Sequence, residues 1–143
     1  DTGRAKFAKK LADQLNATLA IMHKTRPDHN VAEITNVVGD VKNKNLLLID
    51  DMVDTGGSVT SGLDALRKLG AKDIYLGSTH AVFSGPAVER LSSAGFEEVI
   101  VTNSINIPQH KEFSNLKVLS IAPMLAETIK RNYEKKSISS LFI

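Results

Sequence analysis

The fold of this 143-residue chain is decided by the stretch Leu46-Leu47-Leu48-Ile49-Asp50-Asp51-Met52-Val53-Asp54-Thr55-Gly56-Gly57-Ser58. Its aliphatic run does not alternate with polar residues, so it predicts a central parallel strand that is buried on both faces. The two glycines permit a tight turn. Apolar residues at helical spacing follow the turn: Val59, Leu63, Leu66 and Leu69. A buried strand, a glycine turn and a helix in this order are typical of a parallel α/β sheet.

The turn itself has the composition of an anion-binding loop. Glycines at positions 56 and 57 let backbone N–H groups converge, and Thr55 and Ser58 add two hydroxyl donors. The positive end of the following helix dipole favours a phosphate at the same place. A Walker loop is excluded because the loop contains no lysine. An ordinary helix cap would explain one Asp or Thr, but not the whole pattern.

Three carboxylates surround this loop, from Asp50, Asp51 and Asp54. Such a concentration of negative charge beside an anion site is unfavourable unless hydroxyl groups, a divalent cation or basic side chains offset it. The hydroxyls of a sugar can donate hydrogen bonds to paired carboxylates. The stretch therefore predicts a site for a phosphorylated sugar at the carboxyl end of the strand.

The remaining pattern predicts one α/β domain in which strands and helices alternate. We expect strands near Thr18–His23, Asn45–Asp50, Ile74–Ala81, Glu98–Thr102 and Lys117–Ser120. We expect helices near Arg4–Leu15, Val59–Leu69, Pro86–Ala94 and Pro123–Tyr133. The predicted fold class is a three-layer, doubly wound, mostly parallel sheet. The polar stretch from Thr25 to Lys44 is expected to be a long loop with at most a short strand at Ile34–Val38.

Composition narrows the class of protein. An apolar share of 42% suffices for one core, and the absence of cysteine excludes disulfides and thiolate chemistry. The net charge of +2 gives no reason to expect nucleic-acid binding. No stretch has the apolar length of a membrane span, and the chain does not start with a signal peptide. These features favour a cytoplasmic protein that does not bind membranes.

The stretch Asp50–Ser58 closely resembles the phosphoribosyl-diphosphate-binding motif of the type I phosphoribosyltransferase fold. The surrounding sequence resembles the C-terminal half of ribose-phosphate diphosphokinases, also called phosphoribosyl-diphosphate synthetases. The segments that carry this resemblance are His23–Pro27, Val38–Val41, Thr79–Ala87, Val101–Ile105, Leu119–Ala126 and Ser137–Phe142. It implies that residues 1–143 form a single phosphoribosyltransferase-like domain, the C-terminal half of a longer two-domain subunit.

The resemblance also implies an activity, the transfer of diphosphate from ATP to the anomeric hydroxyl of ribose 5-phosphate. Lys24 and Arg26 would be the catalytic residues, and Arg26 would also contact the substrate. We expect both to emerge after the strand at the sheet edge that carries the acidic loop. Asp50 and Asp51 would bind the ribose hydroxyls, and the 5-phosphate would be bound by Asp54, Thr55, Gly56, Gly57 and Ser58. Mg²⁺ would be the cofactor, with Asp1 as a ligand.

Further expectations concern partners and regulation. ATP would be bound largely by the missing N-terminal half and by neighbouring subunits of a homo-oligomer, commonly a hexamer in the family. Ser137, Ser139 and Phe142 match a C-terminal segment that helps to bind a regulatory phosphate or ADP in some members. Two alternatives stay open: a phosphoribosyltransferase that uses phosphoribosyl diphosphate, and a non-catalytic regulatory paralogue. A Lys24→Ala substitution would separate a catalyst from such a paralogue.

Overall fold

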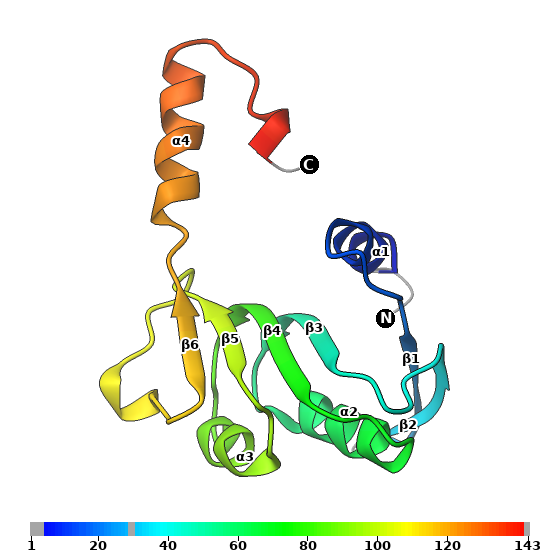
Figure 1. The fold of residues 1–143 in the computed structure, drawn as a ribbon. Coiled ribbons are helices and arrows are strands. Elements are labelled where there is room, and N and C mark those ends of the chain that lie inside the picture. Colours follow the sequence, from blue (N-terminus) through cyan, green and yellow to red (C-terminus); the bar gives the residue numbers. More distant parts are fainter. Residues whose placement is uncertain (1–4, 29–30, 142–143) are drawn as a thin grey trace.

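A computed structural model describes residues 5–28 and 31–141 of the chain (Figure 1). Its helices are α1 (Ala5–Gln14), α2 (Gly57–Lys68), α3 (Ala87–Ala94) and α4 (Ala122–Tyr133), with short 3₁₀ turns η2 (Gln109–Lys111) and η3 (Ser139–Leu141). Its strands are β1 (Ile21–Asp28), β2 (Val31–Val38), β3 (Leu46–Val53), β4 (Ile74–Ala81), β5 (Val99–Thr102) and β6 (Leu116–Leu119).

A four-stranded sheet forms the centre of the domain, with the strand order β3-β4-β5-β6. All neighbouring strands in it are parallel; Leu48 pairs with Leu76, Leu76 with Val99 and Val99 with Leu116. Parallel neighbours require a crossover, and α2 and α3 provide the first two. The predicted parallel α/β architecture is confirmed. The prediction that the Leu46–Ile49 run is a central strand buried on both faces is wrong, because β3 lies at the edge of this sheet and its Leu47 is 44% exposed.

Helices lie on both sides of this sheet. Figure 1 shows α2 and α3 on one side and α1 on the other, beside β3. The core lies between the sheet and α2 and α3, and it includes Val53, Val59, Leu63, Leu66, Ile74, Leu76, Phe83, Ala87, Leu91, Val99 and Val101. Three of the four apolar positions predicted for α2 are buried there, whereas Leu69 at its C-terminal cap is 47% exposed. Gly95 ends α3 with a left-handed conformation, as a C-terminal glycine is expected to do.

The prediction for the segment between α1 and β3 is wrong in two respects. The strand expected at Thr18–His23 runs instead from Ile21 to Asp28, and it is not part of the parallel sheet. The long loop expected from Thr25 to Lys44 largely forms a hairpin, because β1 pairs antiparallel with β2. Hairpin strands satisfy each other's backbone groups, so this segment can be extended without a continuous buried face.

Strand β3 ends later and helix α2 begins earlier than the sequence predicts, so both elements come closer to the acidic loop. β3 continues to Val53, so Asp50 and Asp51 lie inside the strand. α2 already begins at Gly57. Strand and helix are therefore separated by only Asp54, Thr55 and Gly56. Within the described residues, no helix is both long enough and apolar enough to cross a membrane.

Candidate functional site

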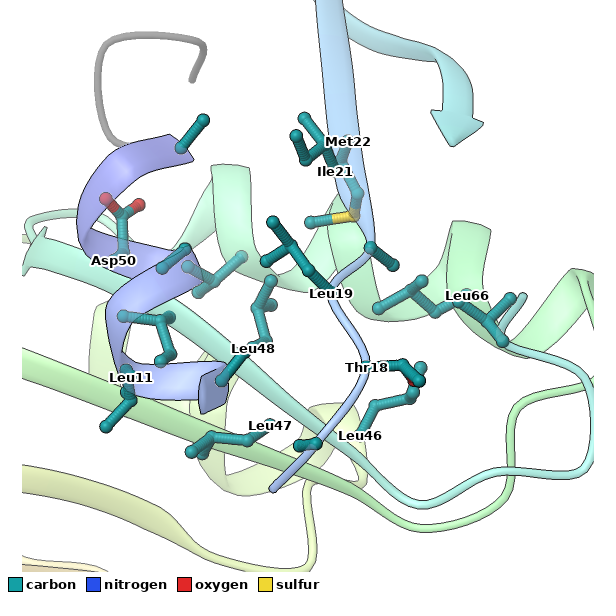
Figure 2. Close-up of a pocket in the computed structure, with 18 of the residues that line it drawn as sticks. Leu11, Thr18, Leu19, Ile21, Met22, Leu46, Leu47, Leu48, Asp50 and Leu66 are labelled. Atoms are coloured by element: carbon teal, nitrogen blue, oxygen red, sulfur yellow. The ribbon is translucent and has the colours of Figure 1, made fainter. Parts of the chain in front are cut away.

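The carboxyl end of β3 opens into a pocket with a volume of about 800 Å³. Four of the predicted sugar-phosphate residues line it: Asp50, Asp51, Asp54 and Ser58. Apolar side chains from α1 and β3 form its other wall, and Figure 2 shows Leu11 and Leu48 beside Asp50 there. The pocket thus combines an apolar floor with an acidic rim at the loop.

The loop between β3 and α2 is held by hydrogen bonds to its carbonyl oxygens. The carbonyls of Val53, Asp54 and Thr55 all accept bonds from the chain that follows β4. The donors to Val53 are the amides of Val82 and Phe83 at 3.0 and 3.1 Å, the donor to Asp54 is the amide of Ser84 at 3.0 Å, and the donor to Thr55 is Nη1 of Arg90 at 3.1 Å. Three successive peptide groups therefore have a fixed orientation.

This orientation also determines where the loop amides point. In a trans peptide the N–H of one residue is antiparallel to the C=O of the residue before it, and the described residues contain no cis peptide bond. The carbonyls are held toward α3 and the segment before it. The N–H groups of Asp54, Thr55 and Gly56 must consequently point the opposite way, which is the arrangement that an anion needs.

The N-terminus of α2 continues this donor surface. Gly56 is its N-cap, with φ 78° and ψ −11°, and no side chain caps the helix. The simple capping explanation for Asp54 and Thr55 is thus wrong. The first amides of a helix have no intrahelical partners, and the helix dipole adds positive potential. Together with the loop amides, they form a site with the geometry and charge for a phosphate group.

Lys24 and Arg26 lie within β1, not after a strand of the parallel sheet, so the predicted reason for their position is wrong. The backbone of Lys24 pairs with Ile34 of the hairpin. The side chains of both residues lie outside the described part of the chain. His23, which directly precedes Lys24, lines the same pocket as Asp50 and Asp54. The catalytic role of Lys24 and Arg26 stays a prediction.

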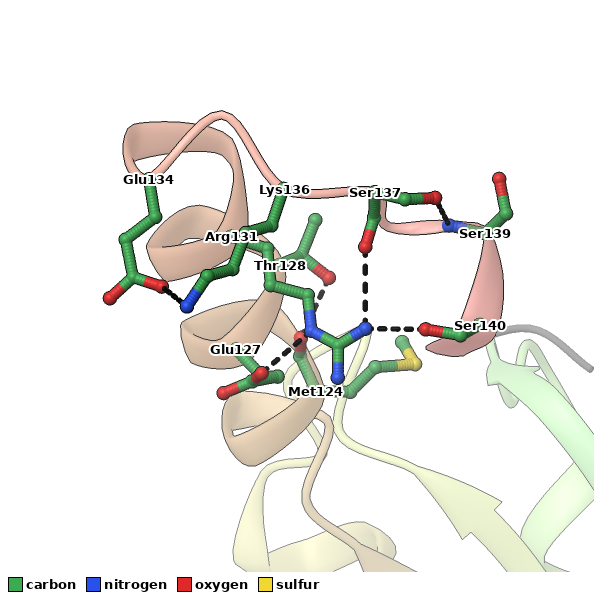
Figure 3. Close-up of polar contacts among 9 residues, drawn as sticks. All are labelled: Met124, Glu127, Thr128, Arg131, Glu134, Lys136, Ser137, Ser139 and Ser140. Atoms are coloured by element: carbon green, nitrogen blue, oxygen red, sulfur yellow. Dashed lines mark hydrogen bonds and ion pairs between the residues drawn. The ribbon is translucent and has the colours of Figure 1, made fainter.

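The predicted regulatory residues are only partly within the described chain, because Phe142 lies outside it. Asp1, the predicted Mg²⁺ ligand, also lies outside the described residues. Figure 3 shows Ser137 beside α4, where its carbonyl accepts a 3.3 Å bond from Nη1 of Arg131. The Ser137 hydroxyl accepts a 3.3 Å bond from the amide of Ser139. The structure thus gives both serines structural contacts and leaves their regulatory role untested.

A metal site is not complete within the described residues. No three of their His, Asp and Glu side chains form a group that could hold a metal ion. Asp50 and Asp51 nevertheless offer carboxylate oxygens beside the loop, and these are the hard ligands that Mg²⁺ prefers. Mg²⁺ needs only one or two protein carboxylates when phosphate and water complete its shell. The donor set therefore fits a magnesium phosphate better than a protein-enclosed ion.

The fold and the loop together define a parallel α/β domain with a loop whose amides are oriented for an anion. Residues 27–143 match the family model described as "Phosphoribosyl synthetase-associated domain". The chain belongs to the ribose-phosphate pyrophosphokinase family, whose C-terminal region it matches. Pyrophosphokinase and diphosphokinase are two names for the same activity, so the resemblance stated from the sequence is confirmed.

Similar proteins agree with this family. A ribose-phosphate pyrophosphokinase of Nostoc sp. is 59% identical over 95% of this chain, which covers 40% of that relative. A ribose-phosphate pyrophosphokinase 2 of Oryza sativa, named as chloroplastic, is 53% identical over 95% of this chain and 33% of its own length. The crystal structure of phosphoribosylpyrophosphate synthetase from Mycobacterium smegmatis matches 93% of this chain and 43% of its own, with a TM-score of 0.83 and 48% identity. The chain thus spans less than half the length of each.

Proposed function

We propose that this chain is the C-terminal half of a two-domain ribose-phosphate diphosphokinase subunit and that it carries the ribose 5-phosphate site. One observation supports this most strongly. The peptide groups at Asp54–Gly56 are oriented for an anion next to a pocket that is lined by the adjacent carboxylates of Asp50 and Asp51. Asp54 and Ser58 of the loop line this pocket as well, whereas Thr55, Gly56 and Gly57 do not. The membership of the chain in the family supports ribose 5-phosphate as the substrate of that pocket.

In this proposal the loop binds the 5-phosphate and β3 binds the sugar. The amides of the Asp54–Ser58 loop, with the hydroxyls of Thr55 and Ser58, donate to the phosphate oxygens. Asp50 and Asp51 accept hydrogen bonds from the 2- and 3-hydroxyls of ribose. These contacts fix the anomeric carbon relative to the strand end, so that its hydroxyl can meet the second substrate.

The reaction is a diphosphate transfer. The anomeric oxygen attacks the β-phosphorus of ATP, the bond from that phosphorus to the α–β bridging oxygen breaks, and AMP leaves with that oxygen. The proton of the anomeric hydroxyl is released to water. Negative charge spreads over the phosphoryl oxygens during transfer, and Lys24 and Arg26 stabilise it. Mg²⁺, with Asp1 as a protein ligand, supplies further charge neutralisation on the diphosphate when it is bound.

The rest of the enzyme completes the site. We propose that ATP is bound largely by the N-terminal half and by neighbouring subunits, and that the subunits assemble into a homo-oligomer, a hexamer in the simplest case. The matched relatives are longer than this chain, and this supports a second half. We propose a cytoplasmic location for the protein, although one relative is named as chloroplastic.

The activity of Lys24→Ala in the complete subunit tests this function. We expect the turnover of ATP and ribose 5-phosphate to AMP and phosphoribosyl diphosphate to fall by about a hundredfold or more, because a cation is lost from the transition state. Lys130→Ala on α4 is the control and should retain activity, because α4 extends away from the sheet that carries the loop (Figure 1). Equal activity of wild type and Lys24→Ala would favour a regulatory paralogue. Transfer of ribose from phosphoribosyl diphosphate to a base would favour a phosphoribosyltransferase.

A further inference from the structure

We propose that Arg90 is a positioning residue for the loop Asp54–Ser58, called the phosphate loop below. Its guanidinium would hold the Thr55–Gly56 peptide in the orientation that directs the Gly56 N–H toward the phosphate. This inference rests on the proposed function, because it assigns a new residue to the same sugar-phosphate site. Arg90 lies on α3 and has no part in the sequence motif.

The contact between Arg90 and the loop is direct. Nη1 of Arg90 donates to the Thr55 carbonyl oxygen at 3.1 Å. A Cβ built on Gly57 would lie 3.5 Å from the same nitrogen. The guanidinium therefore lies against both residues that flank Gly56. A Cβ on Gly57 would make only an ordinary van der Waals contact with this nitrogen.

Helix α3 is a rigid support for this arginine. Ala87 and Leu91, one turn apart on α3, are both fully buried. A Cβ on Gly56 would lie 3.6 Å from Cγ of Leu91 and 3.7 Å from Cα of Ala87. The loop thus rests on the buried face of α3, and Arg90 extends from that helix to the loop carbonyl. Its position depends on core packing rather than on a mobile segment.

The Thr55–Gly56 peptide is the part of the loop that most needs such a restraint. Amides of the backbone hold the Val53 and Asp54 carbonyls, whereas a side chain holds the Thr55 carbonyl. Glycine accepts both signs of φ at little cost, so the peptide before Gly56 can rotate more easily than the others. A rotated peptide would direct its carbonyl oxygen, not its N–H, at the phosphate. A fixed hydrogen bond from Arg90 opposes that rotation.

Arginine suits this role for two reasons. Its planar group presents several donors in a fixed geometry, so one N–H can hold the carbonyl while the others stay available to solvent or ligand. Its charge also makes the hydrogen bond to the Thr55 carbonyl a charge-assisted one, which is stronger than a neutral bond. Lysine would keep the charge but would bind the carbonyl through a more flexible chain.

The chain offers a matched control. Arg67 on α2 is also exposed, and its Nη2 donates to a backbone carbonyl, that of Gly95, at 2.6 Å. Gly95 is the C-cap of α3, at the opposite end of that helix from the loop. Arg67→Gln removes the same kind of bond as Arg90→Gln without touching the phosphate loop. It separates a local effect on the site from a general loss of stability.

Calorimetric titration of the complete subunit with ribose 5-phosphate tests the proposal. We expect Arg90→Gln to raise the Kd about tenfold, the usual effect of losing a charge-assisted hydrogen bond. Arg90→Lys should recover part of the affinity, and Arg67→Gln should bind as wild type does. In steady-state assays, Arg90→Gln should raise KM for ribose 5-phosphate more than it lowers kcat. Wild-type affinity in Arg90→Gln, or an equal loss in Arg67→Gln, would overturn the proposal.

Hydrogen exchange of the loop amides separates this inference from the proposed function. If the wild-type subunit does not bind ribose 5-phosphate, the proposed function fails, but the restraint on the loop is still measurable. Exchange at Thr55–Ser58 should be faster in Arg90→Gln than in Arg67→Gln, with and without inorganic phosphate, because the loop samples more conformations. Unchanged exchange would contradict the role of Arg90 whatever the substrate is.

Discussion

At the scale of single residues, Gly56 carries the conformation that the phosphate loop requires. Its φ of 78° lies in the left-handed region, while the nearest contacts of an added Cβ would be ordinary at 3.6 and 3.7 Å. We therefore expect Gly56→Ala to lower the free energy of unfolding by about 1 kcal/mol through backbone strain alone. Gly57→Ala, at the first helical position and without positive φ, should be neutral or slightly stabilising. Urea denaturation of both variants measures the difference, and equal stabilities would refute this explanation.

The predicted site residues that line the pocket are those that lie close together along the chain. Asp50, Asp51, Asp54 and Ser58 line one pocket because a strand, a short turn and a helix bring them together locally. Arg90 was missed for the opposite reason. It is 35 positions from Thr55, and no pattern in the sequence shows that the start of α3 lies beneath the loop. Only the packing of Ala87 and Leu91 against Gly56 reveals it.

At the scale of elements, a side-chain network joins α4 to the C-terminal segment. Nε of Arg131 donates to Oε1 of Glu127 at 2.7 Å, and Nη1 of Arg131 reaches Ser137 and Ser140 (Figure 3). The hydrogen bond from Arg131 is the main reason why the pKa of the Glu127 carboxyl is below its ordinary value of 4.5. Glu127 thus orients the arginine that holds Ser137 beside the helix.

This pair predicts a pH dependence in acid. Because the folded-state pKa of Glu127 is lowered, its contribution to stability is present above the unfolded-state pKa and is lost as the pH falls through the folded-state pKa. An NMR titration of the Glu127 carboxyl should give a midpoint below 4.5 in wild type and a higher one in Arg131→Met. Lys130→Met should change it less, since Lys130 acts only through a weaker charge interaction. The same midpoint in wild type and Arg131→Met would exclude the hydrogen bond as the cause.

The hairpin of β1 and β2 explains the largest difference between the predicted and the observed elements. Its first strand contains Lys24, Arg26 and Pro27, which do not read as a buried strand. The ladder is interrupted after His23 and again between Thr25 and Asp28. Periodicity detects strands that bury one face without interruption, so a hairpin with an irregular ladder is difficult to predict. The strands of the parallel sheet have such faces and were predicted within a few residues.

At the scale of the whole molecule, burial is distributed unevenly over the domain. The core between the sheet, α2 and α3 contains the fully buried side chains Leu63, Leu76 and Leu91. In contrast, α4 has no buried residue, and Figure 1 shows it extending away from the sheet. The helix expected near Pro123–Tyr133 is present, but a sequence pattern cannot show whether anything covers its apolar side chains. The loop rests on the well-packed part of the domain, which suits a site that must keep its geometry.

This uneven burial predicts two very different local stabilities in the 143-residue chain studied alone. Helix α4 exposes large apolar side chains, with Ile129 at 69% and Tyr133 at 89%. A helix of 12 residues without tertiary packing is only marginally stable in water. Amides of α4 should therefore exchange at least about a hundredfold faster than those of α2, which buries Val59, Leu63 and Leu66. Hydrogen exchange followed by mass spectrometry measures this ratio.

Dilution of the sample is the control, because slow exchange in α4 that becomes fast on dilution would reveal a second copy covering the helix. Equal protection of α2 and α4 at every concentration would mean that α4 packs within the chain, in contradiction to the structure.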